Sequence, residues 1–298
     1  RIVSADWDGT VRLWHLDGTV IGEPLEGHEG QFQSIALSSA GDRIVSAGRN
    51  GTVRLWRLDG TLAAEFLEGH EGQFQSIALS SAGDRMVSAG ADGTVRLWHL
   101  DGSPASAPFE GHEGWVGSVA FNPAGDRIVS RSAAGTVRLW DLDGTPAAEP
   151  FEGHQGGVLS VAFNPAGDRI VSASWDGTVR LWHLDGTPAA EPFEGHEDWV
   201  RSVAFNPAGD RIVSGSDDGT VRLWHLDGSP AAEPFEGHED WVRSVAFNPA
   251  GDRIVSGSDD GTVRLWHLDG SPAAEPFEGH EDWVRSVAFN PAGDRIVS

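Results

Sequence analysis

The chain contains no cysteine, no lysine and no tyrosine among its 298 residues, and only one methionine. Without cysteine there is no disulfide framework, thiol nucleophile or cysteine-ligated zinc. Stability must therefore come from packing and hydrogen bonding. All 21 cationic side chains are arginine, against 45 acidic residues, which gives a formal net charge of −24. Such an acidic chain argues against general binding to nucleic acid, because phosphate attraction needs a basic surface.

Long hydrophobic runs are also missing. No apolar segment approaches the roughly 18 residues of a membrane-spanning helix, and we expect no signal or transit segment at the start of the chain. Hydrophobic residues make up 39% of the sequence, which suits a soluble globular fold. We expect a cytoplasmic protein that binds neither nucleic acid nor membrane.

Repetition dominates what the chain does contain. The tetrapeptide Arg-Ile-Val-Ser begins at residues 1, 43, 127, 169, 211, 253 and 295, and Arg85–Ser88 fills the one gap. The period is 42 residues throughout, so the chain is seven repeats plus four residues. This period indicates stacked copies of one supersecondary unit that cannot bury its apolar surface alone. No linker interrupts the period, so we expect residues 1–298 to form one domain.

Each repeat has the pattern of four short strands. In the copy from 193 to 234, runs rich in β-branched and aromatic residues occupy 199–205, 211–214 and 220–224, separated by turn-forming sequences. A fourth run, 231–235, contains a proline, which favours an edge strand. The inner runs lack clean alternation of apolar and polar residues, as in strands covered on both faces. The pattern predicts an all-β, seven-bladed β-propeller with four antiparallel strands per blade.

The residues that recur in register resemble those of the WD-repeat family. They include the pair Gly195-His196, the Val-Ala-Phe run at 203–205 and the Asp-Gly-Thr-Val-Arg-Leu-Trp run at 218–224. Only Trp140-Asp141 is the literal Trp-Asp pair; elsewhere histidine or arginine follows the tryptophan. Because that second residue should point outward, the departure leaves the fold prediction unchanged.

The resemblance implies a buried hydrogen-bonded tetrad in each blade, made of histidine, serine, aspartate and tryptophan. We choose Ser214 over Ser216 because of its alternation with Ile212. The four regular tetrads are His70, Ser88, Asp92 and Trp98; His154, Ser172, Asp176 and Trp182; His196, Ser214, Asp218 and Trp224; and His238, Ser256, Asp260 and Trp266.

A recurring serine, histidine and aspartate also suggests nucleophilic catalysis. Copies at seven radial positions cannot converge on one substrate, whereas a buried histidine requires a satisfied polar network. We therefore interpret the tetrads as structural and expect no enzyme activity, no cofactor and no metal. Two blades depart from the pattern, since Asn50 replaces the aspartate beside His28 and Ala134 replaces it beside His112. We expect the blade with Ala134 to be the softest.

The two ends of the chain fall within a blade. The N-terminal residues supply the second to fourth strands of one blade, and we expect Trp283–Asn290 to supply its innermost strand and close the ring. His280 would then form a tetrad with Asp8 and Trp14, with Ser4 or Ser298 as the serine. Both Arg1–Ser4 and Arg295–Ser298 match the same strand, so one copy should be displaced.

Candidate binding residues are those that differ between otherwise matching blades. The resemblance implies a partner face around the channel opening, and aromatic and arginine side chains are typical interface anchors. Asp217 and Asp259 are placed to receive a basic group, and Trp7 and Trp175 occupy turn positions that favour exposure. The alternative for Trp199 and its equivalents is packing against adjacent blades. The candidate rim comprises Trp7, Arg49, Trp115, Trp175, Trp199, Arg201, Asp217, Trp241, Arg243, Asp259, Trp283 and Arg285.

These features favour a non-catalytic scaffold that binds proteins or peptides, as an interaction or sensor module of a larger protein. Residues 188–256 recur unchanged as 230–298, so the blades have hardly specialised and weak, multivalent binding is expected. The first alternative is a structural array without an evolved ligand, engineered or excised from a longer chain. A sugar-binding or catalytic propeller is the less favoured alternative. We expect a monomer, with domain-swapped oligomers as the alternative.

Overall fold

The computed structural model describes residues 2–5, 11–14, 19–25, 32–38, 42–48, 52–57, 59–66 and 70–298, and every regular element in them is a β-strand. These residues include no helix long and apolar enough to cross a membrane. The chain divides into two compact units. The first comprises Arg1–Ala134 and Arg138–Ala148, and the second comprises Gly135–Val137 and Glu149–Ser298.

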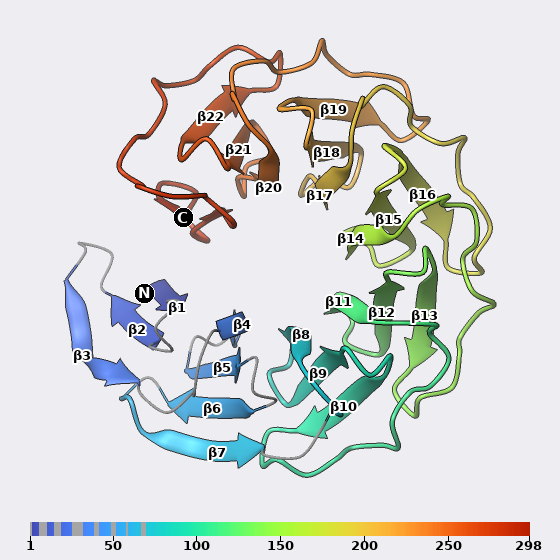
Figure 1. Cartoon of the computed structure of the whole chain (residues 1–298), viewed down its shortest axis with the longest axis vertical. Coiled ribbons are helices and arrows are strands. Elements are labelled where there is room, and N and C mark those ends of the chain that lie inside the picture. The colour runs from blue at the N-terminus through green and yellow to red at the C-terminus, as the bar shows by residue number, and fades with distance from the viewer. Residues whose placement is uncertain are drawn as a thin grey trace. The chain divides into compact units, whose positions relative to one another are not determined.

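The sheets of the first unit follow one another in chain order, each with antiparallel neighbours (Figure 1). The first sheet contains β1 (Ile2–Ala5), β2 (Val11–Trp14) and β3 (Val20–Leu25), and the second contains β4 (Phe32–Leu37), β5 (Arg43–Gly48), β6 (Val53–Arg57) and β7 (Leu62–Phe66). The third contains β8 (Phe74–Leu79), β9 (Arg85–Gly90) and β10 (Val95–His99), and the fourth contains β11 (Val116–Phe121), β12 (Arg127–Ser132) and β13 (Val137–Asp141), whose first residue belongs to the second unit.

The second unit continues the same pattern. Its three complete sheets are β14 (Val158–Phe163), β15 (Arg169–Ser174) and β16 (Val179–His183); β17 (Val200–Phe205), β18 (Arg211–Ser216) and β19 (Val221–His225); and β20 (Val242–Phe247), β21 (Arg253–Ser258) and β22 (Val263–His267). A two-stranded sheet of β23 (Ala288–Phe289) and β24 (Ile296–Val297) follows. Seven sheets of three or four antiparallel strands confirm the predicted all-β blade architecture.

Four strands per sheet is the expectation that the structure corrects. Only the sheet of β4 to β7 has four, whereas in the later sheets the fourth run is held by isolated bridges such as Trp182 to Pro188 and Val179 to Phe193. Proline lacks the N–H that a strand ladder requires. Proline opens the fourth run in the third to seventh repeats, whereas Val20 opens β3 and Leu62 opens β7. The proline therefore shortens the outer strand to two anchoring contacts.

Neighbouring sheets within the second unit pack face to face. One apolar cluster combines Val171 of β15 and Phe193, which bridges to β16, with Val200 and Trp224 of the following sheet. The first strands β14, β17 and β20 lie side by side (Figure 1), and serine hydroxyls link them through backbone N–H groups. The backbone N–H of Val245, for example, donates to the hydroxyl of Ser202 of the preceding sheet at 3.1 Å. This explains why the strands lack polar alternation, because both faces are covered.

The last repeat is less complete than the sequence predicted. The expected strand Trp283–Asn290 is reduced to Ala288–Phe289. Phe277 is 45% exposed, although its counterparts Phe193 and Phe235 are 1% exposed. The ring of Phe235 lies 5.7 Å from that of Trp266 in the next sheet, and Phe277 borders an open cavity within the second unit. Ring closure by the C-terminal strand stays a prediction.

Candidate functional site

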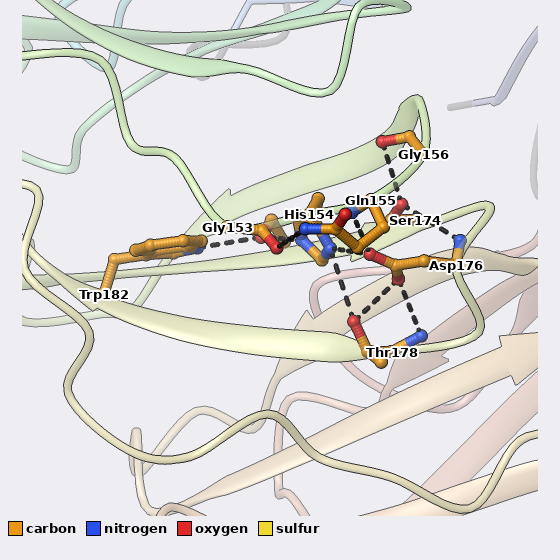
Figure 2. A network of polar contacts seen from close by, with 9 residues as sticks. Gly153, His154, Gln155, Gly156, Ser174, Asp176, Thr178 and Trp182 are labelled. Carbon is orange, nitrogen blue, oxygen red and sulfur yellow. Dashed lines mark hydrogen bonds and ion pairs between the residues drawn. The ribbon is translucent and has the colours of Figure 1, made fainter.

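The predicted tetrad residues lie within hydrogen-bonding distance of one another. In the copy shown in Figure 2, His154 Nδ1 is 2.9 Å from Asp176. Trp182 Nε1 donates to the Ser172 hydroxyl at 2.8 Å. His154 Nε2 is 2.7 Å from the same hydroxyl. Because the carboxylate must accept from Nδ1–H, Nε2 is the acceptor and Ser172 donates to it. The serine thus donates one hydrogen bond and accepts another, which satisfies its buried hydroxyl.

The same arrangement recurs in three other sheets. His196 lies 2.7 Å from Ser214 and 2.8 Å from Asp218, and Trp224 donates to Ser214 at 2.8 Å. Ser214 is therefore the serine of the tetrad, whereas Ser216 accepts from the backbone N–H of Asp218. The remaining copies join His70, Ser88, Asp92 and Trp98, and His238, Ser256, Asp260 and Trp266.

Electrostatics favour one protonation state in the tetrad of His196. Burial lowers the pKa of His196, and the hydrogen bond and charge of Asp218 offset part of that change. Burial disfavours the ionised form of Asp218, but hydrogen bonds and the charge of His196 outweigh burial and lower its pKa. A neutral histidine donates to an ionised aspartate at neutral pH. With Ser214 buried and bonded to Trp224, this geometry suits a structural network.

Of the two blades that lack the tetrad aspartate, the structure describes the site only in the one with Ala134. His28 and Asn50 lie outside the described residues. In the other blade, Trp140 Nε1 donates to Ser130 at 2.7 Å and His112 Nε2 lies 2.6 Å from the same hydroxyl. Ala134 offers no carboxylate there, and burial lowers the pKa of His112 to about 3, with the charge of Arg138 adding to the effect.

The terminal tetrad is only partly described. His280 Nε2 lies 2.6 Å from the Ser298 hydroxyl, in an exposed position. Asp8 lies outside the described residues, and the structure describes Trp14 only in its backbone. The completion of this tetrad stays a prediction. Among the described residues, no group of three or more histidine, aspartate or glutamate side chains has the geometry to hold a metal ion.

Seven of the candidate rim residues form one continuous stack, all within the second unit. Trp175 stacks on Trp199 with ring centroids 5.0 Å apart and planes 25° apart. The Arg201 guanidinium carbon lies 4.8 Å from the Trp199 ring and 5.1 Å from that of Trp241. The same alternation continues to the end of the chain. We call this set the tryptophan–arginine ladder: Trp175, Trp199, Arg201, Trp241, Arg243, Trp283 and Arg285.

Local backbone features place two of the Trp-Arg pairs of the ladder. Trp199 directly precedes β17, and its backbone N–H donates to the Asp198 carboxylate at 2.7 Å, which fixes the approach to the strand. The pairing of β17 with β18 then shifts between Val200 and Ser202, so Arg201 sits in a β-bulge. A bulge redirects a side chain relative to the strand. The repeat of Trp241 and Arg243 before and within β20 has the same features.

Asp217 and Asp259 bind two arginines of the ladder. Arg201 donates to Asp217 through Nε at 2.7 Å and through Nη2 at 2.6 Å, and Arg243 contacts Asp259 in the same bidentate way. The carboxylate side chains are 2% and 4% exposed. The prediction that they receive a basic group from a partner is therefore wrong, because the protein's own guanidinium groups occupy them.

The tryptophans of the ladder are both packed and accessible. Trp175, Trp199, Trp241 and Trp283 are 38–52% exposed, although each contacts a neighbouring ring or guanidinium. These tryptophans therefore pack against neighbouring side chains and also remain exposed, so each of the two predicted alternatives is partly correct. Trp115 is 60% exposed and lies in the first unit, without a stacked ring among the described residues of that unit. Trp7 and Arg49 lie outside the described residues.

Comparisons with known proteins agree with this architecture. The family model for the WD domain, G-beta repeat, matches residues 18–57, 60–99, 104–141, 144–183, 186–225, 228–267 and 270–298. The chain belongs to the WD40 repeat family, whose propellers typically serve as protein-interaction scaffolds. No curated protein matches the chain.

A solved structure gives a fold-level comparison. The chain is similar to the computationally designed Ika8 protein, with 29% sequence identity and a TM-score of 0.83. The alignment covers 97% of this chain and 87% of the designed one. The similarity supports the propeller fold class for this chain.

Proposed function

We propose that the chain is a non-catalytic scaffold that binds a protein or peptide partner through the tryptophan–arginine ladder, as an interaction module of a larger protein. The observation that carries the proposal is the combination of exposure and order in one row of tryptophans. Trp199 and Trp241 are 38% and 40% exposed, and Arg201 lies against both rings while Asp217 holds Arg201. WD40 repeats typically mediate protein interactions.

Order of this kind favours binding. Immobilising a flexible side chain at an interface costs about 0.5–1.5 kcal/mol, and the ladder has already restricted its rings. Tryptophan and arginine are the residue types that most often dominate binding energy. A partner that covers the exposed ring edges would gain this energy without reorganising the surface.

The ligand-free array is the alternative that the sequence repetition supports. Trp241 and Arg243 repeat Trp199 and Arg201 within identical sequence, so the ladder could also arise from copying one stable blade. The two functions differ in one measurable respect. A binding surface selects ligands that require its exposed rings, whereas an inert array selects none.

A displayed peptide library distinguishes the two functions. The wild-type chain is panned against the library, and each selected peptide is tested on Trp241→Ala and on the control Trp115→Ala, which removes an exposed ring outside the ladder. We expect Trp241→Ala to weaken binding about 30-fold, equivalent to about 2 kcal/mol, and the control to have little effect. Peptides that bind both variants equally, or the absence of any selected peptide, would contradict the proposal. Circular dichroism and melting curves verify that both variants fold.

A further inference from the structure

We propose that the ladder binds an extended cationic segment in the polyproline II conformation, with a lysine or arginine at every third residue. This inference rests on the proposed function and specifies its ligand class. Three features of the ladder lead to this ligand class: the spacing of the rings, the indole N–H groups that have no acceptor among the described residues, and the acidic residues that precede Trp199, Trp241 and Trp283.

The upper limit on the ring spacing accommodates the repeat of this conformation. Arg201 lies 4.8 and 5.1 Å from the rings of Trp199 and Trp241, so these two rings are no more than about 10 Å apart. In the same way, the Arg243 guanidinium carbon lies 4.7 Å from the Trp241 ring and 5.8 Å from the Trp283 ring. A polyproline II helix advances about 9 Å in three residues and brings every third side chain to the same face. Successive ligand side chains would therefore lie over successive tryptophans.

Guanidinium groups already contact the inner rings. Arg201 and Arg243 lie 5.1 and 4.7 Å from the centre of Trp241, which is 40% exposed. The ladder's own cations thus take up part of the aromatic surface that a cage for a quaternary ammonium group would need. A ligand can instead engage the indole Nε1–H groups.

The indole N–H groups of the ladder favour a ligand with an extended backbone over a helical one. The Nε1–H groups of Trp199, Trp241 and Trp283 have no acceptor among the described residues. An α-helix also repeats its face at about 10 Å, with seven residues at 1.5 Å each, but its carbonyls are bonded internally. Polyproline II carbonyls have no internal hydrogen bonds and remain free to accept. Aromatic-lined surfaces recognise this conformation in other folds for the same reason.

The charge beside the ladder favours a basic ligand. Each tryptophan from Trp199 onward follows a Glu-Asp pair, and Glu197, Glu239 and Glu281 are exposed. The bidentate contacts with Asp217 neutralise Arg201, so the stacked guanidinium adds little net positive charge. An exposed glutamate therefore lies two residues before each of these tryptophans in the sequence. A lysine of the ligand would lay its aliphatic stem along an indole and direct its ammonium group to such a glutamate.

Two synthetic peptides of identical composition test the spacing. One is four Pro-Pro-Lys triplets, and the other contains the same prolines and lysines with the lysines irregularly spaced, so both keep the polyproline II conformation and the charge. Isothermal titration calorimetry with the full chain measures their dissociation constants. We expect the triplet peptide to bind at least tenfold more tightly. Equal affinities, or no binding of either peptide, would overturn the inference.

Matched protein variants test the charge. Glu197→Gln, Glu239→Gln and Glu281→Gln together remove three carboxylates beside the ladder. The control combines Glu191→Gln, Glu233→Gln and Glu275→Gln, which removes three exposed carboxylates of the fourth runs. We expect the first triple variant to weaken the triplet peptide at least tenfold and the control less than twofold. Equal losses would show a general attraction to an acidic protein and contradict a specific site.

The panned library separates this inference from the proposed function. Selected peptides that lose affinity in Trp241→Ala but lack basic residues at every third position, or that bind as helices by circular dichroism, would refute the ligand class and leave the ladder as a binding surface. If no selected peptide depends on Trp241, both the ligand class and the proposed function are wrong.

Discussion

Replacing Ala134 by aspartate should stabilise the sheet of β11 to β13 by restoring a complete tetrad. The backbone is already suitable, because the N–H of Ala134 donates to Ser132 at 3.0 Å, as the N–H of Asp176 donates to Ser174 at 3.2 Å. An added carboxylate can therefore accept from His112 as Asp176 accepts from His154. A buried hydrogen-bonding partner of this kind contributes about 1–3 kcal/mol to the free energy of unfolding.

The same substitution should reduce the acid sensitivity of this blade. Burial lowers the pKa of His112 to about 3 from an ordinary value of 6.5. The folded state disfavours protonated His112. The free energy of unfolding is therefore highest above pH 6.5 and decreases as the pH falls toward 3. At pH 5.5 His112 alone lowers the free energy of unfolding by about 1.3 kcal/mol relative to pH 7. A carboxylate at position 134 should raise the pKa of His112 and so reduce the decrease in unfolding free energy between pH 7 and pH 5.5.

Hydrogen exchange measured by mass spectrometry on peptides within 112–141 gives the local opening free energy. We expect Ala134→Asp to raise protection there by about 1–3 kcal/mol at pH 7, and by more at pH 5.5. Asp218→Ala is the reverse control and should lower protection around His196 by a similar amount. Unchanged exchange in Ala134→Asp, or wild-type protection in 112–141 that matches the best-protected blade, would refute the reasoning.

Three further predictions concern the ladder, the outer strands and the chain ends. Arg201→Met leaves Asp217 buried without its bidentate partner and should lower the free energy of unfolding by about 3 kcal/mol, measured by denaturant titration; a loss below 0.5 kcal/mol would show that the ion pair is not needed. Leu62→Pro should shorten β7 to isolated bridges and increase its hydrogen exchange, and unchanged exchange would contradict the role of proline. Deleting 295–298 should leave the melting temperature almost unchanged, whereas deleting 283–298 should lower it by several degrees and enlarge the radius of gyration. If the longer deletion has no effect, the proposed ring closure is wrong.

The tetrads could be predicted from the sequence because each one repeats within a single 42-residue unit. Ser214 alternates with Ile212 along one strand, so its inward direction follows from strand geometry, and the structure places it between His196 and Trp224. Pro234 in the fourth run also indicated a weak edge strand. The equivalent Pro24 nevertheless lies within β3, so the shortening follows instead the proline that opens the run, such as Pro230, which the sequence pattern did not single out.

The ladder could not be assembled from one repeat. Arg201 contacts Asp217, which is 16 residues away, and Trp241, which is 40 residues away in the next sheet. Its direction depends on the β-bulge between Val200 and Ser202, which shifts register without a distinct sequence signal. A signal for the ion pair did exist, since Arg201 and Asp217 recur together as Arg243 and Asp259. The repeats without this arginine have neither residue, because Gln33, Gln75, Gly117 and Leu159 are followed 16 positions later by Arg49, Ala91, Ala133 and Trp175. Reading those two positions as a pair would have predicted the occupied carboxylates.

Indole NMR signals of the ¹⁵N-labelled chain test the central proposal most directly. The chain has 13 tryptophans, and single Trp→Phe variants assign their Nε1–H signals. On titration with a peptide selected from the library, we predict shifts for Trp199, Trp241 and Trp283, whose Nε1–H groups lack acceptors among the described residues. The signals of Trp182, Trp224 and Trp266, whose Nε1–H groups donate to buried serines, should stay in place. Binding that leaves the ladder signals unmoved would contradict the assignment of this surface.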